Sequence, residues 1–203
     1  RSLAVGGGDR ASGVGAGRSS VDRRRWRLLT RTAFVADTGV FVRAGGPDNE
    51  KYQRLRSAVV GAGVTLRLPR RVYAELGGDP HVDTYPSGSV VEEAIAAEWV
   101  TVADELDYTN SLVSTVMDQA RRFVAAHTGR DEDLVEKADT ALLGLSAQLL
   151  DSGHARRVVL LTTDKPAGEA ALALFSNHGF DDQVDYRYVG REFLASVEAE
   201  TFR

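Results

Sequence analysis

The chain has no cysteine, and lysine is scarce, with three residues among 203. The absence of cysteine excludes disulfide bonds, thiolate metal sites and cysteine nucleophiles. No apolar run approaches the roughly 20 residues of a membrane-spanning helix. The first thirty residues also lack the apolar segment and small-residue cleavage site of a secretory signal. We therefore expect a cytoplasmic protein with no membrane contact.

Positive charge is concentrated near the start of the chain. Residues 1–31 hold eight arginines and two aspartates, a net charge of +6, whereas residues 32–203 hold 17 basic and 27 acidic residues, a net charge of −10. This acidic, lysine-poor body resembles proteins of salt-loving archaea. Concentrated salt screens long-range repulsion within a few ångströms, so an acidic surface there does not exclude an anionic substrate. In dilute salt the same charge would argue against nucleic acid.

The composition changes at about residue 32. Residues 1–31 are rich in glycine, serine and arginine without apolar periodicity, which predicts a disordered extension. Residues 32–203 are long enough for one domain with its own core. In this part, short apolar runs that predict strands alternate with longer amphipathic patterns. The predicted strands are 33–36, 64–68, 99–102, 158–162 and 186–189.

Helical periodicity fills the segments between these runs. The predicted helices are 48–61, a short one after Pro69, 88–98, 108–126, 133–150, 166–178 and 191–200. Strands that alternate with helices predict an α/β fold with a parallel sheet.

Carboxylates follow the predicted strands. Asp37 comes directly after the first strand and Asp164 after the fourth, while Glu75 lies in the helix after the second strand and Asp139 borders the buried face of a later helix. Ligands of open α/β sheets bind at the carboxyl ends of the strands. Four carboxylates gathered there repel one another unless a cation lies among them. Oxygen ligands suit Mg²⁺ or Mn²⁺, which assist hydrolysis of phosphodiesters.

Each acid also has a structural interpretation that the sequence leaves open. Asp37 could cap the turn that follows it, and Asp164 could cap the next helix. Glu75 could pair with Arg71, four residues earlier. Asp139 could be a solvated helix residue. Only the order of the four acids and their position after strands favour a shared site.

Four segments occur in the order of a known family. They are FVADTGVFV, LPRRVYAEL, KADTALLGLSAQL and VVLLTTDKPAGEAAL, and over residues 33–195 the chain resembles the PIN domain family of metal-dependent nucleases. The resemblance implies a three-layer α/β/α fold with a central parallel sheet of four to five strands. It also implies an endoribonuclease that hydrolyses RNA with Mg²⁺ or Mn²⁺.

The resemblance also implies roles for individual residues. By matching position, the metal-binding and catalytic acids would be Asp37, Glu75, Asp139 and Asp164, and the residues that orient water or ligand would be Thr38 and Thr163. The implied partners are RNA, a second copy of the chain in a homodimer, and an antitoxin-like or ribosome-associated protein. The chain is longer than the small toxin members, so a toxin and an RNA-processing enzyme both stay open.

Two other functions remain as alternatives. The first is a PIN-like RNA-binding or scaffold protein without catalysis of its own. The second is a haloacid-dehalogenase-like phosphatase, for which Asp37, Lys165 and Asp182 would have to lie together. That chemistry needs a second aspartate two residues after the first, where this chain has Gly39. The nuclease instead needs the carboxylates of Asp37, Asp139 and Asp164 to converge on one pocket.

Overall fold

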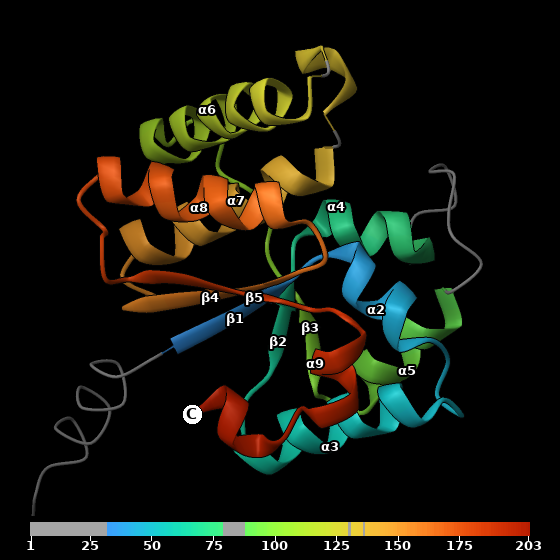
Figure 1. The fold of residues 1–203 in the computed structure, drawn as a ribbon. Coiled ribbons are helices and arrows are strands. Elements are labelled where there is room, and N and C mark those ends of the chain that lie inside the picture. Colours follow the sequence, from blue (N-terminus) through green and yellow to red (C-terminus); the bar gives the residue numbers. More distant parts are fainter. Residues whose placement is uncertain (1–31, 79–87, 130, 136) are drawn as a thin grey trace, which may run out of the picture.

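The computed structural model describes residues 32–78, 88–129, 131–135 and 137–203, so the predicted extension, residues 1–31, lies outside the described residues. Within the described ranges, the strands form one parallel sheet in the order β3-β2-β1-β4-β5 (Figure 1). The strands are β1 (Thr32–Ala36), β2 (Leu66–Leu68), β3 (Val100–Val102), β4 (Arg157–Thr162) and β5 (Val184–Tyr188).

The central strands are buried on both faces. In β4, Val158 and Leu160 belong to one hydrophobic cluster, whereas Val159 and Leu161 belong to the cluster on the opposite face. A strand that lies between two layers must be apolar at every position, because successive side chains point to opposite faces. This explains why β4 reads as an uninterrupted apolar run rather than as an alternating one.

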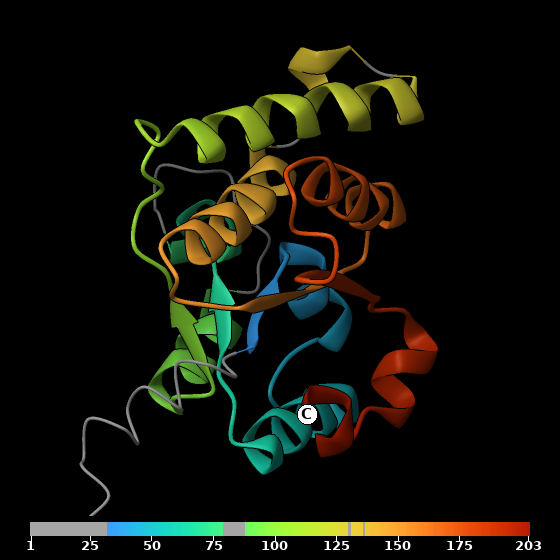
Figure 2. The same cartoon turned by 90° about the vertical axis from the view of Figure 1, so that its left-hand side faces the viewer.

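Three helices cover one face of the sheet. They are α6 (Ser111–Thr128), α7 (Lys137–Asp151) and α8 (Lys165–Asn177), and their apolar sides form a core with Val35 and Leu160 of the strands. Figures 1 and 2 both show α6 farthest from the sheet, lying across α7 and α8. The short 3₁₀ turn η2 (Glu132–Leu134) lies between α6 and α7.

The opposite face is covered by a second set of helices. They are α2 (Thr38–Ala44), α3 (Glu50–Ala62), α5 (Gly88–Ala96), α9 (Arg191–Ser196) and the turn η3 (Ala199–Phe202). Helix α4 (Arg70–Tyr73) and the irregular turn η1 (Ala74–Gly78) follow β2 at its carboxyl end. In Figure 1, α4 and α2 both begin near the centre of the molecule, where the strands end. The predicted three-layer α/β/α fold with a parallel sheet is confirmed.

The helices begin and end where local chemistry supports it. In α3, Tyr52, Leu55 and Val59 face the core at helical spacing, the Asn49 side chain accepts a hydrogen bond from the N–H of Lys51, and Gly63 ends the helix with a φ of 67°. An amphipathic stripe, an asparagine N-cap and a left-handed glycine are the usual signals of such a helix. These signals made α3 predictable to within two residues at each end.

Three elements differ from the sequence-based expectation. Helix α2 was not predicted, because its seven residues span too few turns for a periodic pattern. The predicted helix 133–150 begins at Lys137 instead, after η2. The predicted helix 191–200 is interrupted at Val197, whose backbone is extended, with φ −63° and ψ 132°. Across the described ranges, no helix combines the length and the apolar character that crossing a bilayer requires.

Candidate active site at the carboxyl ends of β1 and β4

The chain leaves the two central strands in opposite directions. From β1 it continues toward β2 and β3, and from β4 it continues toward β5 on the other side of the sheet. Such a switch point opens a crevice outside the carboxyl ends of the two strands, where α/β proteins bind ligands. Asp37 directly follows β1, and Asp164 follows β4 after one intervening residue. The structure therefore brings these two predicted residues to the same edge of the sheet.

Asp37 is nearly enclosed, with 6% of its surface exposed, and its carboxylate accepts three hydrogen bonds. Oδ1 accepts from the N–H of Val40 at 2.9 Å, while Oδ2 accepts from the Thr162 hydroxyl at 2.6 Å and the N–H of Thr163 at 2.8 Å. The bond from Val40 caps α2, as one interpretation of the sequence expected. A carboxylate has about four acceptor positions, so the three bonds leave room for a further ligand on Oδ1.

The surroundings of Asp37 disfavour its negative charge. Burial raises the pKa of Asp37 above the ordinary value of 3.8, and hydrogen bonds from Thr162, Thr163 and Val40 counteract this rise. The negative charge of Asp164 raises the pKa of Asp37 further. A cation between the two carboxylates would remove this repulsion and favour the ionised form.

The Thr162 hydroxyl connects the two acids. It donates to Asp37 and accepts from the N–H of Asp164 at 3.0 Å. The Asp164 side chain in turn accepts from the N–H of Ala167 at 3.4 Å and caps α8, so the capping interpretation of Asp164 also holds. Thr162 was not among the site residues expected from the sequence. It could have been found because it is the last residue of an apolar strand, where a buried hydroxyl needs a hydrogen-bond partner.

Thr163 also contacts the Asp37 carboxylate, through its backbone N–H. Its hydroxyl packs against Gly39 in the first turn of α2. A Cβ on Gly39 would lie 2.0 Å from Thr163 Oγ1, a distance too short for any two non-bonded atoms, so no larger residue fits here without displacement. The glycine thus permits the close approach of α2 to the loop after β4. The Thr163 hydroxyl was expected to orient a water or ligand, and that role stays a prediction.

Glu75 lies in η1 and is held by two neighbours. Its Oε2 accepts from the Thr38 hydroxyl at 2.9 Å, and its Oε1 accepts from Arg71 Nε at 3.2 Å. The pairing with Arg71, considered from the sequence, is therefore present. The bond to Thr38 also links Glu75 to the residue that follows Asp37, and only 17% of the Glu75 side chain is exposed. The Thr38 hydroxyl thus donates to a carboxylate, and the ligand-orienting role expected of it stays a prediction.

Asp139 is the fourth predicted acid. Its position lies in the first turn of α7, a helix that packs on β1 and α4, but its side chain lies outside the described part of the chain. Among the side chains that the structure does describe, no group of three or more histidine, aspartate or glutamate residues is gathered closely enough to hold a metal ion. The expected convergence of all four acids therefore stays a prediction.

The donor chemistry of the site suits a small divalent cation. Mg²⁺ typically binds protein through one or two carboxylates and completes its shell with water and substrate phosphate. Asp37 and Asp164 supply two carboxylates whose charges act on each other, and Oδ1 of Asp37 has acceptor capacity left. The residue types present therefore fit Mg²⁺ or Mn²⁺, and Asp37 and Asp164 are the two candidate ligands whose charges act on each other.

The arrangement does not fit the phosphatase alternative. That chemistry needs Asp182 near Asp37, but Asp182 precedes β5 and so lies at the amino end of that strand. Because β5 is parallel to β4 and β4 to β1, the amino end of β5 is at the opposite edge of the sheet from Asp37. Lys165 does lie near the site, directly after Asp164, but its ammonium group is 5.0 Å from the centre of the Tyr188 ring.

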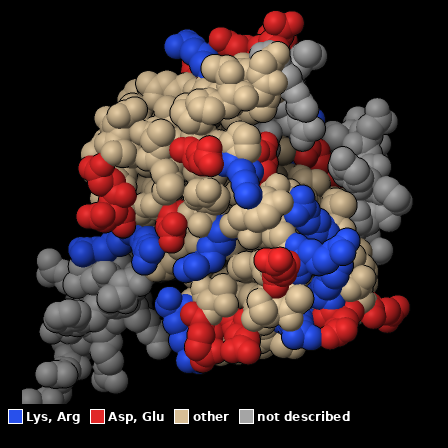
Figure 3. All heavy atoms as spheres, in the orientation of Figure 1, with Lys and Arg blue, Asp and Glu red and all other residues tan. Residues whose placement is uncertain are grey.

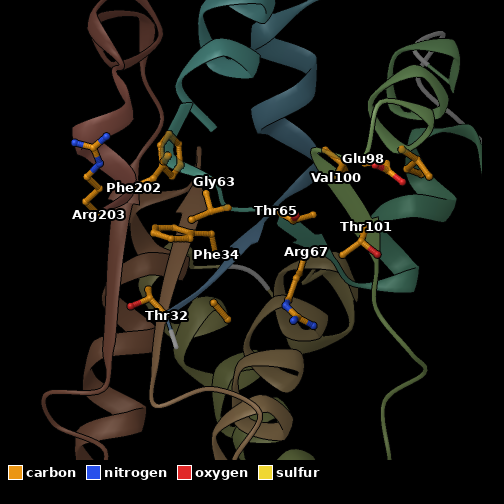
Figure 4. A pocket seen from close by; sticks show the side chains of 14 residues that line it. Thr32, Phe34, Gly63, Thr65, Arg67, Glu98, Val100, Thr101, Phe202 and Arg203 are labelled. Atoms are coloured by element: carbon orange, nitrogen blue, oxygen red, sulfur yellow. The ribbon is translucent and has the colours of Figure 1, made fainter. Parts of the chain in front are cut away.

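A pocket of about 800 Å³ lies at that opposite edge (Figure 4). Figure 4 shows side chains from the amino ends of β1, β2 and β3 around it, together with those of the last two residues. Its lining is mainly apolar residues, among them Phe34 and Phe202, together with threonines and the charged residues Glu98, Arg67 and Arg203. Asp37 and Asp164 do not line this pocket, and the switch-point argument concerns the carboxyl ends of the strands. We therefore place the candidate active site at Asp37 and not in this pocket.

Comparison with known proteins agrees with the sequence resemblance. The family model described as the halobacterial PIN domain matches residues 30–202. A search of curated proteins gave no match. The family match spans every described element of the fold and contains the four segments on which the resemblance rested. The chain therefore belongs to the halobacterial PIN domain family.

Proposed function

We propose that the chain is a divalent-metal-dependent endoribonuclease that hydrolyses RNA in the cytoplasm. The observation that carries the proposal is the buried carboxylate of Asp37, fixed by Thr162 and Thr163 beside Asp164 at the switch point of the sheet. A buried acid with a second acid next to it is costly to the fold, and the raised pKa of Asp37 indicates that its three hydrogen bonds offset only part of this cost, which a bound cation would reduce further. Membership of a nuclease family supports RNA hydrolysis as the use of such a site.

In the proposed reaction, the chain positions the acids. Asp37 and Asp164 would hold Mg²⁺ or Mn²⁺, and Thr162 and the N–H of Thr163 fix the Asp37 carboxylate in place. The bound metal would supply charge stabilisation for a phosphodiester under attack by water. Glu75, held by Thr38 and Arg71, and Asp139 would complete the acidic site. A carboxylate of this set would accept a proton from the attacking water while the bond from phosphorus to the leaving oxygen breaks.

The test is cleavage of a labelled mixed RNA pool by the purified protein in concentrated salt with Mn²⁺ or Mg²⁺. The variants are Asp37→Asn and Asp164→Asn, because asparagine can still cap a helix. The matched control is Asp118→Asn, which removes an exposed carboxylate of α6 that pairs with Arg121 only at 4.0 Å. We expect metal-dependent cleavage that the control retains and that both site variants lose by at least about 100-fold.

Other outcomes decide between the alternatives. RNA that binds but is not cut with either metal would favour the PIN-like scaffold without catalysis. Equal cleavage by wild type and both site variants would indicate a contaminating nuclease and contradict the proposed site.

A further inference from the structure

Tyr188 is an exposed aromatic residue beside the candidate active site. It is the last residue of β5, its Cα pairs in register with Thr162, and 38% of its surface is exposed. Neighbouring strands lie about 4.8 Å apart, so Tyr188 is one strand from the hydroxyl that binds Asp37. Gly190 allows the ring to lie close to the chain that follows, since a Cβ there would be 2.9 Å from Tyr188 Cε1.

Two cationic side chains meet at this ring. Arg43, at the end of α2, has its guanidinium carbon 5.6 Å from the ring centre and donates from Nη1 to the Tyr188 hydroxyl at 3.3 Å and to the Val189 carbonyl at 3.2 Å. Lys165, the first residue of α8, has its ammonium nitrogen 5.0 Å from the ring centre. These distances fall within the range of cation–π contacts. Residues from three elements thus form one cluster, the Tyr188 cluster.

The cluster is unusual in so acidic a chain. Residues 32–203 carry a net charge of −10 and contain three lysines. In the part of the chain that the structure describes, Arg54, Arg71, Arg157 and Arg203 pair with acids, and Arg43 and Lys165 are among the basic residues for which no ion pair is found. In the view of Figure 3, basic side chains lie among acidic ones. Binding of an anion here must therefore depend on local groups.

We propose that Tyr188, Arg43 and Lys165 bind one nucleotide of single-stranded RNA next to the acidic site, an inference that rests on the proposed function. The base stacks on the exposed part of the Tyr188 ring, and the flanking phosphates meet Arg43 and Lys165. Because Lys165 directly follows Asp164, the bound strand is anchored one residue from the acids. The cluster therefore determines where the strand lies relative to the bond that is cut.

The geometry selects a single strand over a duplex. Stacking on a tyrosine needs an unpaired base whose face is free, whereas the bases of a double helix are stacked on one another. Stacking also persists in concentrated salt, where contacts between cations and phosphates weaken. In such salt we expect Tyr188 to contribute more to binding than either cation.

The test measures binding without cleavage. A fluorescein-labelled twelve-nucleotide oligouridine is titrated with the full chain in EDTA and followed by fluorescence anisotropy, so the result does not depend on catalysis. Tyr188→Ala is expected to weaken binding about 5- to 150-fold, the range found for loss of one stacked base. Tyr188→Phe, which keeps the ring, is expected to stay within about threefold of wild type. Lys165→Gln should lower the slope of log K against log salt by about 0.7.

The matched control for the cation is Lys51→Gln, in the first turn of α3 and outside the cluster, and it should leave binding and slope unchanged. Thermal unfolding of each variant establishes that it is folded. A separate experiment locates the contact in the wild-type protein. An oligonucleotide carrying 5-iodouridine is photocrosslinked to it, and the crosslinked peptide is expected to contain Tyr188.

Three results would overturn the proposal. They are wild-type affinity in folded Tyr188→Ala, equal loss in Lys51→Gln and Lys165→Gln, and crosslinks confined to other peptides. A duplex RNA of the same length bound with the same dependence on Tyr188 would contradict the preference for single strands. If the wild-type protein binds RNA in this way but does not cleave it, the result would contradict the proposed nuclease and leave the proposed binding site standing.

Discussion

The Thr162 hydroxyl donates a hydrogen bond of 2.6 Å to Oδ2 of Asp37 and at the same time accepts one from the backbone N–H of Asp164. One oxygen atom therefore fixes both acids that follow the central strands. In a parallel sheet, β1 and β4 hold their backbones in register, but their loops are separate segments. The hydroxyl joins those loops, so the position of each acid depends on a residue with no charge of its own.

Replacement of this hydroxyl is expected to affect stability and cleavage together. Thr162→Val keeps the shape but leaves the N–H of Asp164 without its partner, which should destabilise the fold by about 1–3 kcal/mol. Cleavage should fall as well, because the Asp37 carboxylate loses one of its three donors. Thr162→Ser, which keeps the hydroxyl, should retain most of the activity. Denaturant unfolding and RNA cleavage measure both effects, and equal activity in the valine and serine variants would contradict this role.

A methyl group on Gly39 should displace the loop after β4. In Gly39→Ala the new Cβ would overlap Thr163 Oγ1, so either α2 or Thr163 must move and the N–H of Thr163 leaves Asp37. We expect a loss of about 1–3 kcal/mol in the free energy of unfolding and strongly reduced cleavage. The control is Gly46→Ala, where no atom lies within 4 Å of the added Cβ. Unchanged cleavage in Gly39→Ala would show that the site tolerates this displacement.

The raised pKa of Asp37 predicts a pH-dependent cost to stability. Because the pKa is higher in the folded than in the unfolded chain, the folded state binds the proton more tightly. The resulting stability is present below pH 3.8 and is lost as the pH rises through the folded-state pKa. In EDTA, the stability difference between Asp37→Asn and wild type should therefore shift in favour of the variant from pH 4 upward. Denaturant unfolding at a series of pH values tests this, and a stability difference between Asp37→Asn and wild type that does not change with pH would contradict it.

A divalent cation should stabilise the folded protein through the two acids. At about 100 times its dissociation constant, a ligand of the folded state adds about 2.7 kcal/mol. For a chain of this length, that raises Tm by roughly 5–10 °C. Asp37→Asn and Asp164→Asn should show a much smaller rise with Mn²⁺, at constant total ionic strength. An equal rise in the wild type and both variants would place the cation elsewhere.

The apolar runs and amphipathic stripes predicted the alternation of strands and helices and the parallel sheet, whereas the three layers were implied by the resemblance to a known family. The ends of elements were less certain, as with α7, which begins at Lys137 after the separate turn η2. Helix α2 was missed because seven residues carry too little periodicity.

For the site, the sequence predicted that Asp37 and Asp164 lie at one edge of the sheet, since the rule for parallel strands depends only on chain order. It did not predict the contact between Glu75 and Thr38 or the choice of Thr162 over Thr163 as the side-chain donor to Asp37. Such contacts depend on the distances between loops, which no local pattern encodes. The Tyr188 cluster likewise joins three segments that are remote in the sequence.

The strand order has a consequence for the making of the protein. Asp37 directly follows β1, but the groups at Thr162 and Thr163 that hold its carboxylate are synthesised more than 120 residues later. Until β4 has been made, the position beside β1 that β4 occupies is empty, and β1, β2 and β3 have no second acid next to Asp37. The acidic pair therefore cannot assemble on a nascent chain before β4 and the loop after it have left the ribosome.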